Sequence, residues 1–178
     1  FPAVAAPRIP PLLAGRRVAI ARDAAYGFIY PANVDTLHAL GAETVFFSPL
    51  AGEVLPVCDA LWLPGGYPEL HVERLAANTW FQRGLRAHLE AGKPMLAECG
   101  GLMSLLEAIV DRDGVEHPGA GLLPGRARMQ SRLVALGLQA AELPEGRLTG
   151  HTFHYSRTET ALAPLLRAHR LDGGEGEA

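Results

Sequence analysis

Cys99 is the residue whose sequence context best suits a nucleophile. It lies in the segment MLAECGGLM, residues 95–103, between an apolar run and a glycine pair. Such a segment is typical of a strand, a tight turn and a helix, and the small residues Ala97 and Gly101 would permit a strained turn at the cysteine. The free N–H groups of the helix would point at the sulfur and favour the thiolate, which is the nucleophilic form. The pattern therefore predicts a nucleophile elbow.

A buried structural cysteine is the alternative interpretation, because free cysteines are among the most buried residue types. Cys58 fits that role, since it precedes Asp59 at the entrance of an expected strand and away from any expected helix N-terminus. We interpret Cys58 as structural. Cys99 remains the candidate nucleophile because it lies at a strand-turn-helix junction.

A cysteine nucleophile also requires hydrogen-bond donors for the oxyanion that forms on its substrate. The segment LPGGYPE, residues 63–69, places Gly65 and Gly66 directly after an expected strand. Glycines allow the backbone to turn its amides toward a ligand, so Gly66 could supply one donor and Gly100 the second. A glycine pair equally fits an ordinary loop at a strand end, and the pair alone does not decide between the two.

The third requirement is a general base, and the chain has seven histidines. His38 and His88 lie in helix-like stretches and are expected at the surface. His71, His117 and His169 lie in polar or loop-like contexts. None of these five has a context that favours a role beside Cys99.

The segment GHTFHYS, residues 150–156, holds the other two histidines, His151 and His154. Side chains alternate between the two faces of a regular strand, so these two would point to opposite faces. At most one of them can then face Cys99, and the residues themselves do not choose which.

The elements that would position these residues alternate between strand and helix. Buried-strand patterns occupy residues 16–21, 43–49, 59–66 and 93–98, and helical patterns occupy residues 31–41, 79–92 and 100–110. This alternation predicts an α/β fold, flavodoxin-like or Rossmann-like, with a mostly parallel sheet and helices on both faces. After Gly114 the helical rhythm fades, and residues 132–143 and 146–157 are expected to form strands of mixed direction.

Composition excludes several classes of protein. The 178 residues are 48% hydrophobic and 20% charged, with a net charge of −3 and without a dense Lys/Arg cluster, which argues against a nucleic-acid binder. No apolar stretch approaches the roughly 20 residues that cross a bilayer. Two cysteines cannot form a disulfide framework, so a cytoplasmic location is expected. The proline-rich residues 1–15 are expected as an interdomain linker, residues 16–170 as the folded domain and residues 171–178 as a flexible tail.

Taken together, the motifs LPGGYPE, AECGGLM and GHTFHYS resemble a known family in both order and spacing. They are similar to the glutaminase domain of cobyrinic and hydrogenobyrinic acid a,c-diamide synthases, a class I glutamine amidotransferase-like domain of the cobyric-acid-synthase type. The resemblance covers most of residues 17–156. It implies that Cys99 is the nucleophile and that His154 is the general base. The residues implied to bind the substrate and its oxyanion are Gly65, Gly66 and Gly100.

The resemblance also implies an activity and partners. The domain would hydrolyse L-glutamine through a cysteine thioester and pass ammonia to an N-terminal ATP-dependent amidoligase domain of the same full-length chain. That domain would amidate a corrinoid precursor, cobyrinate or hydrogenobyrinate, in cobalamin biosynthesis. ATP and Mg would belong to it, since the sequence lacks a phosphate-binding G-x-x-x-x-G-K-[ST] loop, and neither cofactor nor metal ligand is expected in this domain.

Two positions depart from related patterns. Class I glutaminases usually carry a glutamate two residues after the histidine, where this chain has Ser156, so the orienting partner of His154 is left open. The resembled family usually carries a glutamate where this chain has Thr152. A catalytically weak or inactive domain that packs against its synthetase is therefore an alternative. A cysteine peptidase or chaperone of similar fold is a further alternative, which loss of LPGGYPE would favour, but that element is intact.

Overall fold

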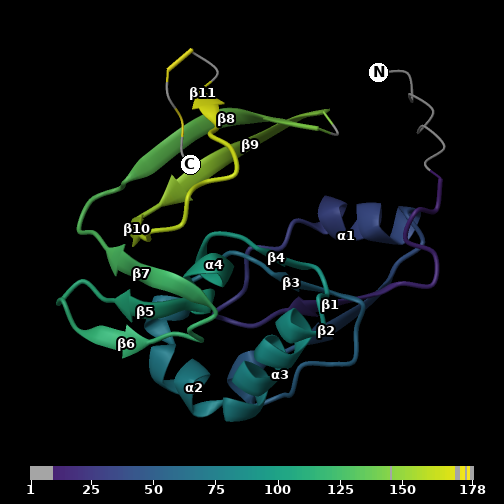
Figure 1. The fold of residues 1–178 in the computed structure, drawn as a ribbon, viewed down its shortest axis with the longest axis horizontal. Helices are drawn as coiled ribbons and strands as arrows, with labels where there is room; N and C mark the ends of the chain where they lie inside the picture. The colour runs from purple at the N-terminus through teal and green to yellow at the C-terminus, as the bar shows by residue number, and fades with distance from the viewer. Residues whose placement is uncertain (1–9, 145, 171–172, 175, 177–178) are drawn as a thin grey trace. The chain divides into compact units, whose positions relative to one another are not determined.

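The protein forms two compact units, Phe1–Ser104 and Leu105–Ala178. A computed structural model describes residues 10–144, 146–170, 173–174 and 176 (Figure 1). The first unit holds the alternating strands and helices, and the second is built almost entirely of strands. The expected division into a linker, a domain of residues 16–170 and a tail stays a prediction, and residues 1–9 of that linker lie outside the described residues.

A four-stranded parallel sheet forms the centre of the first unit, in the order β2-β1-β3-β4. Its strands are β1 (Arg17–Ala21), β2 (Glu43–Phe47), β3 (Ala60–Leu63) and β4 (Met95–Ala97). The strand order is that of a flavodoxin-like sheet, in which ligands bind beyond the carboxyl ends of the strands. The sequence-based expectation of a parallel α/β sheet is confirmed here.

Helices cover both faces of this sheet, with α1 on one side and α3 on the other (Figure 1). The α-helices among the described residues of the unit are α1 (Pro31–Ala39), α2 (Val72–Ala77), α3 (Thr79–Glu90) and α4 (Gly100–Leu105), the last of which ends one residue past the boundary of the unit. Two short 3₁₀ turns lie at Pro49–Ala51 and Pro68–Leu70. The helix α2 and the two 3₁₀ turns were not anticipated from the sequence. They are each six residues or shorter, too short for a helical period to show.

Local signals explain where the two longer helices begin and end. The side chain of Asn78 accepts a hydrogen bond from the Phe81 amide and so caps the start of α3. Phe81 and Leu85 then lie about one turn apart, and both are buried. After α1, Gly41 adopts a left-handed φ of 87°, which ends the helix before β2.

The described residues of the second unit form two sheets. One has the order β10-β7-β5-β6 and the other the order β11-β8-β9. Their strands are β5 (Leu106–Val110), β6 (Glu116–Pro118), β7 (Leu123–Met129), β8 (Ala135–Leu143), β9 (Gly146–His154), β10 (Ser156–Glu159) and β11 (His169–Arg170). Strands β5 and β7 run parallel and the other pairs are antiparallel, so the expectation of later strands in mixed directions is confirmed.

The helix expected over residues 100–110 is shorter than predicted. Helix α4 ends at Leu105, and Leu106–Val110 forms β5 instead. The apolar residues of this run recur at helical spacing, but a nearly continuous apolar run also suits a buried strand, and periodicity cannot separate the two. Pairing decides the outcome, because β5 is hydrogen-bonded to β6 on one side and to β7 on the other.

Candidate active site

Cys99 lies in a sharp turn between the end of β4 and the start of α4. Its φ of 47° is left-handed, and among the described residues it is the only non-glycine with a positive φ. An L-residue in this region costs roughly 1–2 kcal/mol and persists only where the surroundings impose it. The turn is therefore the strained elbow that the sequence predicted.

Small residues and backbone hydrogen bonds hold the elbow in place. The amide of Gly101 donates to the carbonyl of Glu98 at 2.8 Å, which closes the turn around Cys99. A Cβ atom on Gly101 would stand 2.1 Å from the carbonyl oxygen of Leu63, so only glycine fits against β3 at this position. The Cys99 carbonyl then accepts from the Met103 amide at 3.1 Å and starts the helix.

Gly65, Gly66 and Gly100 gather around the thiol, as the motifs predicted. The backbone N–H groups of Gly66 and Gly100 both hydrogen-bond to Cys99 and stabilise its thiolate. A Cβ on Gly65 would lie 3.3 Å from the Cβ of Cys99. Two converging backbone donors beside a thiol have the geometry that an oxyanion would require if this thiol acted as a nucleophile.

A loop after β1 supports this glycine pair from behind. The Phe28 amide donates to the Gly65 carbonyl at 2.9 Å. A Cβ on Gly66 would lie 2.1 Å from the carbonyl oxygen of Ala25. The buried hydroxyl of Tyr26 donates to Ser104 at 2.9 Å, and Ser104 donates to the Gly100 carbonyl at 3.2 Å, which ties the same loop to α4.

The pKa of Cys99 is raised above its ordinary value, so the expectation of a thiolate-favouring elbow is wrong in direction. Partial desolvation of the sulfur is the main cause, although the residue as a whole is exposed to solvent, and the carboxylates of Glu69 and Glu98 add to it. The amides of Gly100 and Gly66 lower the pKa but do not outweigh the desolvation. Helix α4 has only six residues, so its dipole is a small counterweight. A thiol in this state needs a base to become a nucleophile.

Cys58 has the surroundings of a structural cysteine. Its side chain is buried, and its sulfur lies 3.7 Å from Nδ1 of His88. The expectation that His88 lies at the surface is wrong, because only 5% of it is exposed. Its Nε2 lies 3.0 Å from the Pro94 carbonyl, so His88 joins α3 to the chain that enters β4. An amphipathic helix pattern cannot show that a histidine satisfied at both nitrogens faces the core.

His154 and His151 lie on β9, in the second unit, whereas Cys99 lies in the first. Strands β8 and β9 pair without a break in register, so residues three apart on β9 point to opposite faces, as predicted. His154 is half-buried and His151 is exposed. The pairing of either histidine with Cys99 stays a prediction.

The structure supplies an orienting partner for His154 that the sequence left open. Nδ1 of His154 lies 2.9 Å from the backbone carbonyl oxygen of Ser156. A carbonyl can only accept, so Nδ1 carries the hydrogen and the lone pair of the neutral ring lies on Nε2. A backbone carbonyl of residue 156 therefore contacts the imidazole, at the position where class I glutaminases usually carry a glutamate. A sequence motif built on side chains cannot reveal it.

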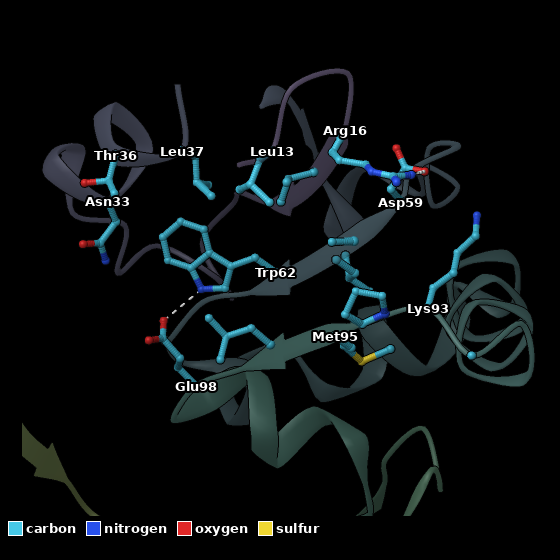
Figure 2. A pocket seen from close by; sticks show the side chains of 16 residues that line it. Leu13, Arg16, Asn33, Thr36, Leu37, Asp59, Trp62, Lys93, Met95 and Glu98 are labelled. Carbon is cyan, nitrogen blue, oxygen red and sulfur yellow. Dashed lines mark hydrogen bonds and ion pairs between the residues drawn. The ribbon is translucent and has the colours of Figure 1, made fainter. Parts of the chain in front are cut away.

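A separate hollow lies on the face of the sheet next to α1 (Figure 2). Its volume is about 780 Å³, and β1, β3 and β4 contribute to its floor. Trp62 and Leu96 line it together with Glu98, the residue directly before Cys99. Among the described residues no group of three or more His, Cys, Asp or Glu side chains could hold a metal ion. No helix in the described part of the chain is long and apolar enough to cross a bilayer.

Comparison with known proteins decides the family. Residues 17–177 match the model of the CobB/CobQ-like glutamine amidotransferase domain. The chain belongs to this family. The CobB/CobQ-like domain is thus a glutamine amidotransferase domain, and the resemblance found from its three motifs is confirmed.

Curated relatives of this CobB/CobQ-like domain are much longer proteins. It is 58% identical over 159 residues to the hydrogenobyrinate a,c-diamide synthase of Stutzerimonas stutzeri, a match that covers 89% of this chain and 37% of the relative. It is 45% identical over 169 residues to the cobyrinate a,c-diamide synthase of Herminiimonas arsenicoxydans, covering 94% of this chain and 39% of the relative. The chain therefore spans less than two fifths of the length of these relatives.

Solved structures share the fold of the CobB/CobQ-like domain. A glutamine amidotransferase aligns with a TM-score of 0.63 at 20% identity, over 88% of this chain and 82% of that one. A putative peptidase E from Listeria monocytogenes EGD-e aligns with a TM-score of 0.51 at 18% identity, over 62% of this chain and 64% of that one. At these identities the likeness establishes the class I glutamine amidotransferase-like fold.

Proposed function

We propose that this domain hydrolyses L-glutamine at Cys99 and supplies the ammonia for ATP-dependent a,c-diamidation of cobyrinate or hydrogenobyrinate. The observation that carries the proposal is the convergence of the Gly66 and Gly100 amides on a cysteine held in a left-handed turn. Membership of a glutamine amidotransferase family supplies the substrate class. The names of the relatives supply the final reaction.

The first half of the reaction forms a thioester and releases ammonia. Nε2 of His154 takes the proton of the Cys99 thiol as the sulfur attacks the carboxamide carbon of glutamine. The carbonyl oxygen becomes an oxyanion, which accepts hydrogen bonds from the Gly66 and Gly100 amides. The C–N bond then breaks, the imidazolium gives its proton to the departing nitrogen, and ammonia leaves a γ-glutamyl thioester behind.

The second half regenerates the thiol. A water molecule attacks the thioester carbon while His154 accepts one of its protons, and the same two amides again stabilise the oxyanion. The C–S bond breaks, the sulfur recovers the proton from His154, and glutamate is released. The raised pKa of Cys99 supports a role for a base, because the thiol would otherwise hold its proton at neutral pH.

The remaining parts of the reaction are assigned to other portions of a longer chain. Because this chain spans 37% of the Stutzerimonas relative, we expect an ATP-dependent amidoligase domain to occupy part of the remainder in the full-length protein. ATP and Mg would bind there, and the corrinoid precursor would receive the ammonia there. We expect the reaction to take place in the cytoplasm, in keeping with a chain of two unpaired cysteines.

Replacement of the nucleophile tests the proposal. In the full-length protein, Cys99→Ala should abolish glutamine hydrolysis and glutamine-dependent amidation while ammonia-dependent amidation persists, since free ammonia bypasses the thioester. Cys58→Ala is the matched control and should retain glutamine-dependent activity. Glutamine hydrolysis that survives Cys99→Ala would overturn the proposal. Absence of glutaminase activity in the unaltered protein would favour an inactive domain that packs against the synthetase.

A further inference from the structure

The residue directly before the nucleophile is held by three interactions, two from its backbone and one from its side chain. The amide of Glu98 donates to the Leu63 carbonyl at 3.0 Å, and its carbonyl accepts from the Gly101 amide. Its carboxylate accepts a hydrogen bond from the indole nitrogen of Trp62 at 2.8 Å. Glu98 thus joins the last residue of β3, the turn and the side chain of Trp62.

Trp62 is a rigid anchor for this carboxylate. The residue lies on β3 and is only 5% exposed, in a core cluster with Val18, Ile20 and Ala42. Strand pairing sets Trp62 opposite Leu96, so Glu98, two residues further on, continues on the same face of the sheet. Figure 2 shows the Glu98 carboxylate turned back toward the indole. An exposed side chain beyond a strand end is in this way fastened to a buried one.

The charge of Glu98 by itself is unfavourable to the thiolate. The carboxylate is one of two that raise the pKa of Cys99. A neutral side chain would suit the nucleophile better if charge were the only effect of this residue. The hydrogen bond to Trp62 supplies a different effect, because it restrains the residue on which the strained turn of Cys99 depends.

We propose that Glu98 is a positioning residue that, anchored to Trp62, holds the Cys99 turn in its reactive conformation. This inference rests on the proposed glutaminase function of Cys99. The elbow is unfavourable for a non-glycine residue and relaxes unless its flanks are fixed. Relaxation of the turn would move the sulfur away from the Gly66 and Gly100 amides, and misplacement by about 1 Å can cost on the order of a hundredfold in rate.

Two substitutions remove the hydrogen bond from opposite sides, and a third removes only the charge. Glu98→Ala deletes the acceptor, and Trp62→Phe deletes the donor while keeping an aromatic ring. Glu98→Gln keeps an oxygen that can accept from the indole. Trp80→Phe is the matched control, because Trp80 is 63% exposed on α3. We would measure kcat and KM for glutamine hydrolysis, ammonia-dependent amidation, the pH profile of Cys99 alkylation and the thermal midpoint, all in the full-length protein.

We expect Glu98→Ala and Trp62→Phe to lower kcat for glutamine by about 10- to 100-fold with little change in KM. Ammonia-dependent amidation should persist, and Glu98→Gln and Trp80→Phe should retain most of kcat. The alkylation profile should move to lower pH in both Glu98 variants, which lose the charge, and stay in place in Trp62→Phe. Loss of rate would then follow the hydrogen bond rather than the charge.

Two results would overturn the inference. One is an unchanged kcat in Trp62→Phe or Glu98→Ala, and the other is a loss in Glu98→Gln as large as that in Glu98→Ala. If Trp62→Phe lowers the thermal midpoint, Glu98→Ala decides, because it changes an exposed side chain and leaves the core intact. The Cys99→Ala variant separates this inference from the proposed function, since glutamine hydrolysis that survives that change contradicts the function itself.

Discussion

Gly66 and Gly100 approach each other so closely that a Cβ on Gly100 would stand 2.8 Å from the Gly66 carbonyl oxygen and 3.0 Å from its nitrogen. Two segments that are separated by more than thirty residues thus bring their amides to one thiol. Any side chain at either position would have to displace backbone, because the nearest atoms belong to the main chain or to Pro68.

Substitution of Gly66 should therefore lower the stability of the protein and abolish its glutaminase activity. A Cβ at this position would lie 2.1 Å from the Ala25 carbonyl oxygen, so we expect Gly66→Ala to cost about 3 kcal/mol of unfolding free energy and to abolish glutamine hydrolysis. Gly27→Ala is the control, because its Cβ would meet the Asp23 carbonyl oxygen at an ordinary 3.5 Å. Urea unfolding and a glutaminase assay measure the two effects, and a fully active Gly66→Ala protein would contradict the assigned oxyanion hole.

The two cysteines should differ sharply in reactivity. Cys99 is exposed and Cys58 is buried, so a glutamine-analogue electrophile should label Cys99 well before Cys58 in the native protein. The pKa of Cys99 is raised, and the thiolate is the reactive form, so its labelling rate in a His154→Ala protein should rise with pH up to and beyond the ordinary cysteine value near 9. Mass spectrometry of the labelled peptides distinguishes the two sites. Equal labelling of both thiols would count against the elbow.

Much of the first unit follows from sequence pattern. Hydrophobic runs bounded by proline and glycine located its four strands, and Gly41 marked the end of α1. The error at residues 106–110 arose where an apolar run was continuous, because only pairing with β6 and β7 distinguishes a strand from a helix there. Burial of His88 likewise depends on what packs against α3, which a helical period does not contain.

The candidate site was predictable where backbone geometry demands glycine. The motifs therefore predicted that Gly65, Gly66 and Gly100 lie next to Cys99, and the roles of these four residues in a reaction stay predictions. Hydrogen bonds that depend on strand register or on main-chain acceptors could not be predicted from the sequence. The hydrogen bond between Trp62 and Glu98 exists because β3 and β4 pair in one register, and the partner of His154 is a carbonyl that any residue at position 156 could provide.

The buried phenol of Tyr26 is expected to make the free energy of unfolding fall at alkaline pH. Burial is the main cause of its raised pKa, its hydrogen bond to Ser104 opposes that effect, and the charge of Asp23 adds to it. The neutral phenol is thus favoured in the folded state, so its contribution is complete below the unfolded pKa of about 10 and is lost above it as pH rises toward the folded pKa. We expect the unfolding free energy to fall above pH 10 by about 1.4 kcal/mol per pH unit from this group.

Tyr26→Phe tests this pH dependence. The variant should lose about 1 kcal/mol at neutral pH with the hydrogen bond to Ser104, and its stability should decline less steeply above about pH 10. Tyr30→Phe is the control, because Tyr30 is 56% exposed. The pKa of Cys58 is also raised by burial, so this thiol adds its own fall in unfolding free energy at alkaline pH. The slopes of the variants are therefore compared with one another and not with a slope of zero. Urea unfolding at several pH values gives the slopes, and identical slopes with and without Tyr26 would contradict the assignment.

The two histidines of β9 should have unequal roles. We expect His154→Ala to lower glutamine-dependent amidation by about 100- to 10,000-fold, the range for loss of a general base, while ammonia-dependent amidation persists. His154 is the half-buried member of the pair, and its Nδ1 is held by the Ser156 carbonyl, which leaves Nε2 as the basic nitrogen. His151→Ala is the matched control on the opposite face of the same strand and should retain glutamine-dependent activity.

If His151→Ala alone loses glutamine-dependent amidation and keeps ammonia-dependent amidation, His151 is the general base instead of His154. The proposed glutaminase function would still hold in that case. Loss of ammonia-dependent activity in both variants would instead place these residues in support of a domain interface.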